Sequence, residues 1–468
     1  MRKYICIMAA VMSGLATLAS HAATIEWFQS GYDKHTNTVI EWKAMNSPAL
    51  EKFDNSDYRV LSINQKDMLQ EIDGFGAAFN EKGWDALSGL SQTEHAKVLT
   101  SLFASHNGLN LTLGRIPIGA NDFSMDYYSL DDHPADYEMK HFSIARDEKY
   151  LIPFIKAALA YQPDMQFFAS PWTPPAWMKA NNYYGCRGSE GRAHLVWEPK
   201  IEQAYALYLS KFVQAYQEKG INISAVHLQN EPAACQDFPS STWTGLQMRD
   251  FLRDYLIPQF EKDKLPATAW LGTINYGDYE SYAKPVLEDK ALRGKLGGVG
   301  YQWDGKYAIE ETRKRYPGTK LIQTESECGN GSNDLFAGFY TFNLIKKYLE
   351  AGASQYYYWN MVLDSSGNSS WGWKQNSLIS VDRMYGKVSY NFEYYVLKHV
   401  SALVRPKAHL LNMKNDEDAL AFINTDNSIV LVLANPSYSE KQMRITLGDK
   451  MIRVKMPMLT MNSLVINL

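Results

Sequence analysis

Cysteine is scarce in this 468-residue chain, which has only four. Cys6 lies in an apolar N-terminal segment, and the other three, Cys186, Cys235 and Cys328, are too few to build a disulfide scaffold. Cys186 and Cys235 lie in polar segments and could pair in an oxidising compartment. The sequence leaves that pairing open, and Cys328 fits a buried thiol.

Basic blocks and metal-binding patterns are also missing. The formal net charge is -4, with no lysine-rich stripe, which argues against nucleic acid or an anionic membrane surface as a partner. The ten histidines form no His-x-x-x-His pair, and no cluster of three Cys or His residues occurs. A Gly-x-Ser-x-Gly elbow is absent, and Gly74-Phe75-Gly76 is not followed by a third glycine at dinucleotide-binding spacing. We therefore expect no metal and no cofactor.

Long apolar runs are confined to the N-terminus. Arg2 and Lys3 precede an apolar stretch over residues 5–19, and Ser20-His21-Ala22 supplies the small residues of a signal-peptidase site. The pattern predicts a signal peptide over residues 1–22 and a secreted or periplasmic product that does not insert into the membrane after cleavage. A retained membrane anchor is the alternative.

The central part of the chain alternates between short apolar runs and helical periods. Helices are predicted over residues 200–219 and 333–350. The candidate strands, rich in β-branched and aromatic residues, are 71–79, 109–118, 165–172, 224–230, 267–275, 297–303, 320–325 and 354–362. Eight such alternations predict an α/β chain with a (β/α)8 barrel over residues 68–397. A doubly wound open sheet is the alternative fold.

The two ends of the chain lack the strand–helix alternation of the centre. Residues 398–468 contain short alternating strands separated by Asp-Asn, Asn-Pro and Gly-Asp turns, and residues 23–67 are also strand-like. We expect both ends to form one small β-sandwich beside the barrel.

Two predicted strands end in glutamate, where a barrel places its reacting groups. One runs into Asn230-Glu231-Pro232 and the other ends in Thr324-Glu325. Glycosidic hydrolysis needs one carboxylic acid and one carboxylate on opposite sides of the scissile bond, and Asn230 could bind the sugar 2-hydroxyl. Glu327 is a rival nucleophile, because residues i and i+2 of a strand point the same way. The alternative is that Glu231 and Glu325 are loop or salt-bridge carboxylates without a catalytic role.

Several motifs between residues 73 and 401 together resemble glycoside hydrolase family 30, which includes lysosomal glucosylceramidase, β-1,6-glucanases, β-xylosidases and xylanases. The motifs are Gly74-Phe75-Gly76-Ala77-Ala78, Gly114-Arg115-Ile116-Pro117-Ile118, Asn121-Asp122-Phe123-Ser124, Ala169-Ser170-Pro171-Trp172-Thr173-Pro174-Pro175 and Asn230-Glu231-Pro232. The resemblance implies retaining chemistry, a barrel, and a sandwich built from both chain ends.

The resemblance also implies roles for individual residues. Glu231 matches the acid/base, and the run 317–325 matches the approach to the nucleophile, which favours Glu325 over Glu327. The remaining site candidates are Glu81, Trp172, Asn230, Trp303, Trp359 and Trp371 for sugar contact, and Arg115 and Tyr301 for support.

One departure from the family pattern bears on the substrate. Many glucosidase members have a histidine before the tryptophan of the sixth strand, whereas this chain has Gln302 before Trp303. The departure argues against glucosylceramide as the substrate, whereas the signal peptide, the simple architecture and the lack of a membrane-seeking helix favour a polysaccharide. We expect a monomeric β-glucosidic hydrolase acting on β-1,6-glucan. An exo-acting β-glucosidase, a glucosylceramidase, a xylan-active enzyme and a non-catalytic carbohydrate-binding protein are the alternatives.

Overall fold

The computed structural model describes residues 23–52, 60–413, 416 and 418–467. The predicted signal peptide, residues 1–22, lies outside the described residues. None of the helices in the described part combines the length and the apolar character needed to cross a bilayer.

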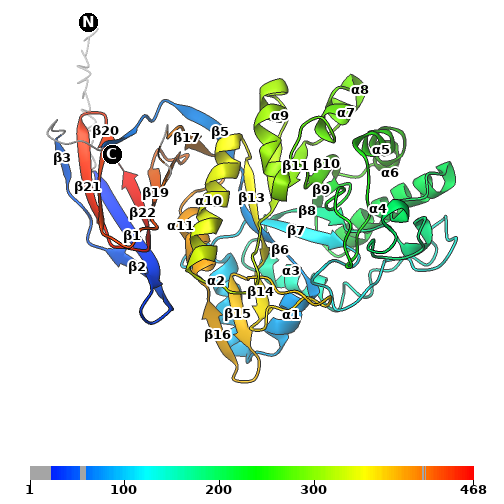
Figure 1. The fold of residues 1–468 in the computed structure, drawn as a ribbon, viewed down its shortest axis with the longest axis horizontal. Helices are drawn as coiled ribbons and strands as arrows, with labels where there is room; N and C mark the ends of the chain where they lie inside the picture. Colours follow the sequence, from blue (N-terminus) through cyan, green and yellow to red (C-terminus); the bar gives the residue numbers. More distant parts are fainter. Residues whose placement is uncertain (1–22, 53–59, 414–415, 417, 468) are drawn as a thin grey trace, which may run out of the picture.

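Eight parallel strands form a barrel at the centre of the molecule (Figure 1). Their order is β12-β11-β10-β9-β8-β7-β6-β13. The seam between β12 and β13 is joined by Gln323, whose side chain accepts from the Tyr357 N–H at 2.6 Å and donates to the Tyr357 carbonyl at 3.2 Å. The strands are β6 Gly74–Ala78, β7 Leu113–Ile118, β8 Gln166–Pro171, β9 Ile223–His227, β10 Thr268–Ile274, β11 Val299–Gln302, β12 Leu321–Glu325 and β13 Gln355–Asn360.

Helices surround the barrel and cover the outer side of the strands. In α4 the first residue is a proline, which suits a helix N-terminus. In α10 the chain turns out of the helix at Gly352, whose φ of 120° suits glycine. The helices are α1 Glu81–Ser88, α2 Gln92–Phe103, α3 Leu151–Leu159, α4 Pro199–Glu218, α5 Gly245–Phe251, α6 Ile257–Asp263, α7 Ala283–Leu287, α8 Lys290–Arg293, α9 Ile309–Arg315, α10 Leu335–Ala351 and α11 Phe392–Ser401.

Both ends of the chain meet in a β-sandwich beside the barrel (Figure 1). β1 pairs antiparallel with β22, so the first and last described strands are neighbours. One sheet has the order β2-β1-β22-β19-β18-β17-β5 and the other β3-β21-β20-β4. The strands are β1 Thr24–Asp33, β2 Thr38–Met45, β3 Leu50–Lys52, β4 Val60–Ile63, β5 Met68–Ile72, β17 Ala408–Leu411, β18 Ala419–Ile423, β19 Ile429–Asn435, β20 Lys441–Leu447, β21 Lys450–Met456 and β22 Thr460–Asn467. The predicted architecture is confirmed.

Two local features differ from the sequence prediction. The predicted strand 71–79 is two strands, because the chain leaves β5 in the sandwich sheet and enters β6 in the barrel on either side of Asp73. A small sheet of β14 Val362–Asp364, β15 Ile379–Asp382 and β16 Lys387–Tyr390 was not expected. Its strands are short, and the alternation they carry is too brief to identify them.

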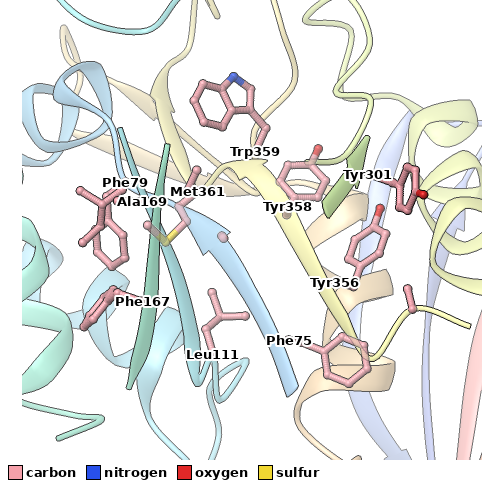
Figure 2. Packing of buried hydrophobic residues seen from close by; sticks show 14 of the residues in the cluster. Phe75, Phe79, Leu111, Phe167, Ala169, Tyr301, Tyr356, Tyr358, Trp359 and Met361 are labelled. Atoms are coloured by element: carbon pink, nitrogen blue, oxygen red, sulfur yellow. The ribbon is translucent and has the colours of Figure 1, made fainter. Parts of the chain in front are cut away.

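Successive side chains of the barrel strands point alternately outwards, into an apolar layer beneath the helices, and inwards, into the barrel interior. Tyr356 and Tyr358, two residues apart on β13, point to the same side, with Phe75 of β6 nearby (Figure 2). Inside the barrel, an apolar layer includes Leu113 and Phe168. Because side chains repeat every two residues, the next layer towards the carboxyl ends holds the residues that follow by two. That layer includes the polar residues Arg115, Ser170 and Thr324, which form part of the floor of the site.

Candidate active site

Glu231 and Glu325 face each other at the carboxyl end of the barrel. Glu325 is the last residue of β12, and Glu231 follows β9 by four residues. The Nε2 of Gln302 donates to Oε1 of Glu231 and to Oε2 of Glu325, each at 3.2 Å. These two carboxylate oxygens therefore lie no farther apart than twice that distance. This limit is compatible with the separation of about 5–5.5 Å between the two carboxyl groups of retaining glycosidases.

Arg115 on β7 organises the floor beneath the two carboxylates. It is fully buried, and its Nη1 donates to Oε2 of Glu325 at 2.6 Å. Its Nη2 donates to Oδ1 of Asn230 at 2.7 Å and to the Ser170 hydroxyl at 3.1 Å. A planar guanidinium can hold several acceptors in fixed directions, so Arg115 sets the orientation of Glu325 and Asn230 together.

Asn230 has its amide orientation determined by this network. Its Oδ1 accepts from Arg115, from the Thr273 hydroxyl at 3.1 Å and from Gln302 at 3.1 Å. Among the described residues, no acceptor is found for its Nδ2, and Asn230 lines the cavity. The group that Asn230 presents to a ligand is therefore a hydrogen-bond donor.

The charge state of Glu231 suits an acid. Desolvation of its carboxyl, together with the negative charge of Glu325, raises the pKa of Glu231 to about 8. The hydrogen bond from Gln302 and the charge of Arg115 act in the opposite direction. At neutral pH Glu231 is therefore mainly protonated.

The backbone at the site is held in an unusual conformation. Glu231 has a φ of 47° and Trp303 a φ of 49°, both in the left-handed region that non-glycine residues rarely occupy. The Glu231 N–H donates to the Thr273 carbonyl at 3.1 Å, and the Trp303 indole N–H donates to Oε1 of Glu325 at 3.0 Å. Such local strain is often found where a functional side chain must be aimed.

A cavity of about 530 Å³ opens above the two carboxylates. Four predicted sugar-contact residues line it: Trp172, Asn230, Trp303 and Trp371. Trp359 is buried behind Trp172, with ring centroids 5.3 Å apart, and so supports that ring from beneath. Tyr301 points out of the barrel, and its hydroxyl lies 2.5 Å from that of Thr312 on α9. Tyr301 therefore supports the packing of β11 against α9.

Glu81 lies outside this cavity. It is the first residue of α1 and is fully buried, and its carboxylate accepts from Arg146 at 2.8 and 2.9 Å and from the Met125 N–H at 2.7 Å. The expectation that Glu81 contacts the sugar does not fit this geometry, because both of its oxygens are occupied by protein donors.

Asp122 is a buried cavity carboxylate that was not assigned from the sequence. It lies in the loop after β7 and lines the cavity, with its Oδ1 buried and unpaired among the described residues. Burial and the charges of Glu325 and Glu231 raise the pKa of Asp122 well above its usual range. The sequence signal was present, since Asp122 lies inside the motif Asn121-Asp122-Phe123-Ser124 just after a barrel strand. Gln302 was noted only as a departure, and its bridge between the carboxylates was not foreseen.

The rival Glu327 is turned away from the cavity. It follows β12, pairs with Lys306 at 2.6 Å and accepts from the Tyr340 hydroxyl at 2.5 Å. The strand ends at Glu325, so the two-residue alternation no longer applies at Glu327. The geometry thus leaves Glu325 as the carboxylate that faces Glu231.

Cys186 and Cys235 form a disulfide bond, and Cys328 is a buried free thiol. The disulfide joins two loops that contribute Arg187, Gln236 and Asp237 to the cavity wall. The pairing that the sequence left open is thus present, and it ties together two parts of the rim.

A barrel of this topology, with two bridged carboxylates at its carboxyl end beneath a tryptophan-lined cavity, defines a glycoside hydrolase. Residues 72–404 match the model of the glycosyl hydrolase family 30 TIM-barrel domain, and residues 409–464 match that of the family 30 β-sandwich domain. The chain belongs to glycosyl hydrolase family 30.

The chain is similar both to proteins named as glucosylceramidases and to proteins named as endo-1,6-β-D-glucanases. It is 29% identical to putative glucosylceramidase 2 of Caenorhabditis elegans, over 89% of this chain and 83% of that protein. It is 29% identical to an endo-1,6-β-D-glucanase of Trichoderma harzianum, over 64% of this chain and 61% of that protein. The solved structure of SrfJ from Salmonella typhimurium matches with a TM-score of 0.84 at 26% identity, over 94% of this chain and 99% of that one.

Proposed function

We propose that this chain is a retaining β-glycosidase that hydrolyses β-D-glucosidic bonds by double displacement, with β-1,6-glucan as its substrate. The observation that carries the proposal is the Gln302 bridge, which brings the carboxyls of Glu231 and Glu325 together at a spacing compatible with retention. The raised pKa of Glu231, about 8, supports its role as the acid.

In this mechanism Glu325 attacks the anomeric carbon while Glu231 gives its proton to the leaving oxygen. The products of the first step are a glycosyl ester on Glu325 and a free leaving group. Glu231, now ionised, removes a proton from water, which attacks the same carbon and releases Glu325. Arg115 places a positive charge against the Glu325 carboxylate before it attacks and when it is released.

The remaining cavity residues suit glucosyl recognition. Asn230 lines the cavity, and its Nδ2 would donate to the 2-hydroxyl, a contact that strengthens at the transition state. Asp122 would accept from another sugar hydroxyl, since its Oδ1 has no described protein partner. Trp172 and Trp371 supply aromatic walls for the sugar faces.

Two observations favour β-1,6-glucan. Gln302 stands where many glucosidase members have histidine, and a relative is an endo-1,6-β-D-glucanase. The second candidate is glucosylceramide or another small β-glucoside, favoured by the resemblance to putative glucosylceramidase 2 over 89% of this chain.

A substrate panel tests the proposal. The purified chain is incubated with pustulan (a β-1,6-glucan), laminarin, an aryl β-glucoside, glucosylceramide and xylan, and the products are sized. We expect oligosaccharides from pustulan and the β-anomer first in proton NMR. Exclusive hydrolysis of glucosylceramide would move the assignment to the second candidate, and the α-anomer first would contradict retention.

We also propose that the protein acts outside the cytoplasm as a monomer. The N-terminal pattern of residues 1–22 supports export, and the Cys186–Cys235 disulfide is consistent with an oxidising compartment. N-terminal sequencing of the exported protein should begin after Ala22, and light scattering should give the mass of one chain.

A further inference from the structure

A second cavity, larger than the catalytic one, adjoins the acid/base side of the site. Its volume is about 1170 Å³, compared with about 530 Å³ for the catalytic cavity. The two share a wall made by the loops after β9 and β10. Glu231 and Asn275 line the catalytic side, whereas the residues next to them, Pro232 and Tyr276, line the larger side.

The shared wall is held by one hydrogen bond between the two loops and by another within the loop after β9. The Ala233 N–H donates to Oδ1 of Asn275 at 3.2 Å, and the Trp243 N–H donates to the Pro232 carbonyl at 2.9 Å. The larger cavity therefore has a fixed position relative to Glu231, because the backbone that separates them is short and hydrogen-bonded. Such a pre-formed surface can bind a ligand with little loss of conformational entropy.

An exposed aromatic ring lies on this wall. The Tyr276 side chain is half exposed, at 46%, and its ring packs edge-on against Tyr282 with centroids 5.9 Å apart and planes at 62°. Tyr282 is itself fixed, because its hydroxyl donates to the Trp243 carbonyl at 3.0 Å. Tyr276 thus presents a held aromatic surface next to the acid/base.

The charges of the larger cavity restrict what it can hold. Its lining carries four carboxylates against one arginine and one lysine. Lys284 pairs with Glu280 inside the cavity. Asp289 pairs with Arg253 and Arg249 with Asp250, which leaves the carboxylates of Glu190 and Glu288. The remaining excess of negative charge disfavours an acidic glycan and leaves hydroxyl-rich neutral sugars as the matching chemistry.

We propose that this cavity binds the leaving-group side of a neutral glucan chain, with Tyr276 as the stacking platform. The inference rests on the proposed function, because the acid protonates the oxygen that departs with the leaving group, so those sugar residues lie on the Glu231 side. A cavity of this volume is larger than most single-ligand pockets and accommodates several sugar units. The substrate class is therefore an oligo- or polysaccharide cleaved within its chain.

The test compares kcat/KM for two kinds of substrate in three variants. Linear gluco-oligosaccharides of β-1,6, β-1,3 and β-1,4 linkage extend beyond the scissile bond, whereas an aryl β-glucoside has no sugar there. In Tyr276→Ala, the ratio of kcat/KM for the longest cleaved oligosaccharide to that for the aryl glucoside should fall about tenfold. Tyr276→Phe keeps the ring and should keep the ratio.

Tyr385→Ala is the matched control, because Tyr385 is 78% exposed in the turn between β15 and β16 and should leave the ratio unchanged. An unchanged ratio in Tyr276→Ala, or an equal fall in both substrates, would overturn the inference. So would cleavage of the aryl glucoside with no oligosaccharide cleaved. A Tyr276-dependent ratio on β-1,3 or β-1,4 oligosaccharides alone would support the inference while refuting the β-1,6 substrate.

Discussion

The mouth of the barrel buries charged and amide side chains, whereas the interior of the sandwich buries aliphatic ones. At the barrel mouth, Arg115, Gln302 and Glu325 are nearly inaccessible and joined by hydrogen bonds of 2.6–3.3 Å. In the sandwich, Leu431 of β19 and Ile445 of β20 are both fully buried in an aliphatic cluster.

Buried side chains have different roles in the two regions. Aliphatic contacts have no required direction, so the sandwich interior can stabilise the fold with many different packings. A buried polar network needs every donor matched to an acceptor, so the barrel mouth tolerates few substitutions and holds its carboxylates in one arrangement. Changes at the mouth should therefore alter activity, and changes in the sandwich should alter stability.

The largest expected effect is on the nucleophile. Glu325→Gln keeps the shape of the side chain but cannot form the glycosyl ester, so kcat should fall by roughly four orders of magnitude. Steady-state kinetics on an aryl β-glucoside measures the fall. In the native chain, a mechanism-based fluoro-glycoside should label Glu325, as read by mass spectrometry of peptides. Labelling of Glu327 would contradict the assignment.

The acid/base should show a smaller loss that a nucleophile can restore. Glu231→Ala should lower kcat by about 10²- to 10⁴-fold on substrates that need protonation. With a dinitrophenyl glucoside the first step needs no acid, and added azide needs no base, so azide should restore turnover and give the β-glucosyl azide. If azide gives no rescue, while Glu325→Ala is rescued to the α-azide, Glu231 is structural.

The bridge between the carboxylates should control the pH profile. Glu231 acts in its protonated form, so activity of the native chain should fall as the pH rises through its pKa of about 8. The hydrogen bond from Gln302 lowers that pKa, so Gln302→Met, which removes the donor, should move the alkaline limb to higher pH. A roughly tenfold loss of kcat should accompany the shift. An unmoved limb in a pH–kcat/KM profile would show that the bridge does not act on Glu231.

The sandwich should give the smallest effect on activity. Leu431→Ala leaves a cavity in the aliphatic cluster and should lower the free energy of unfolding by about 2–5 kcal/mol, with kcat unchanged at low temperature. Chemical denaturation measures the loss, and Lys43→Ala on the exposed side of β2 is the control. A large change in kcat for Leu431→Ala would show that the sandwich and the barrel mouth are coupled.

Most elements of the barrel could be predicted from the sequence. The eight barrel strands and the two helices at 200–219 and 333–350 were predicted within a few residues, because apolar periodicity is a local property. The positions of Glu231 and Glu325 followed from the same strands, since reacting groups of a barrel lie where strands end. The strand break at Asp73 was not predicted, because the apolar pattern continues across it.

The barrel, the sandwich built from both ends, and the two strand ends that carry the proposed catalytic glutamates could all be predicted from the sequence. Three features became clear only from the folded chain: Asp122 rather than Glu81 reaches the cavity, Gln302 bridges the two carboxylates, and Cys186 pairs with Cys235. The physical reason is that alternation predicts side-chain direction only within a strand. Beyond the strand end, direction depends on how loops from different strands pack against one another, and no local pattern records that.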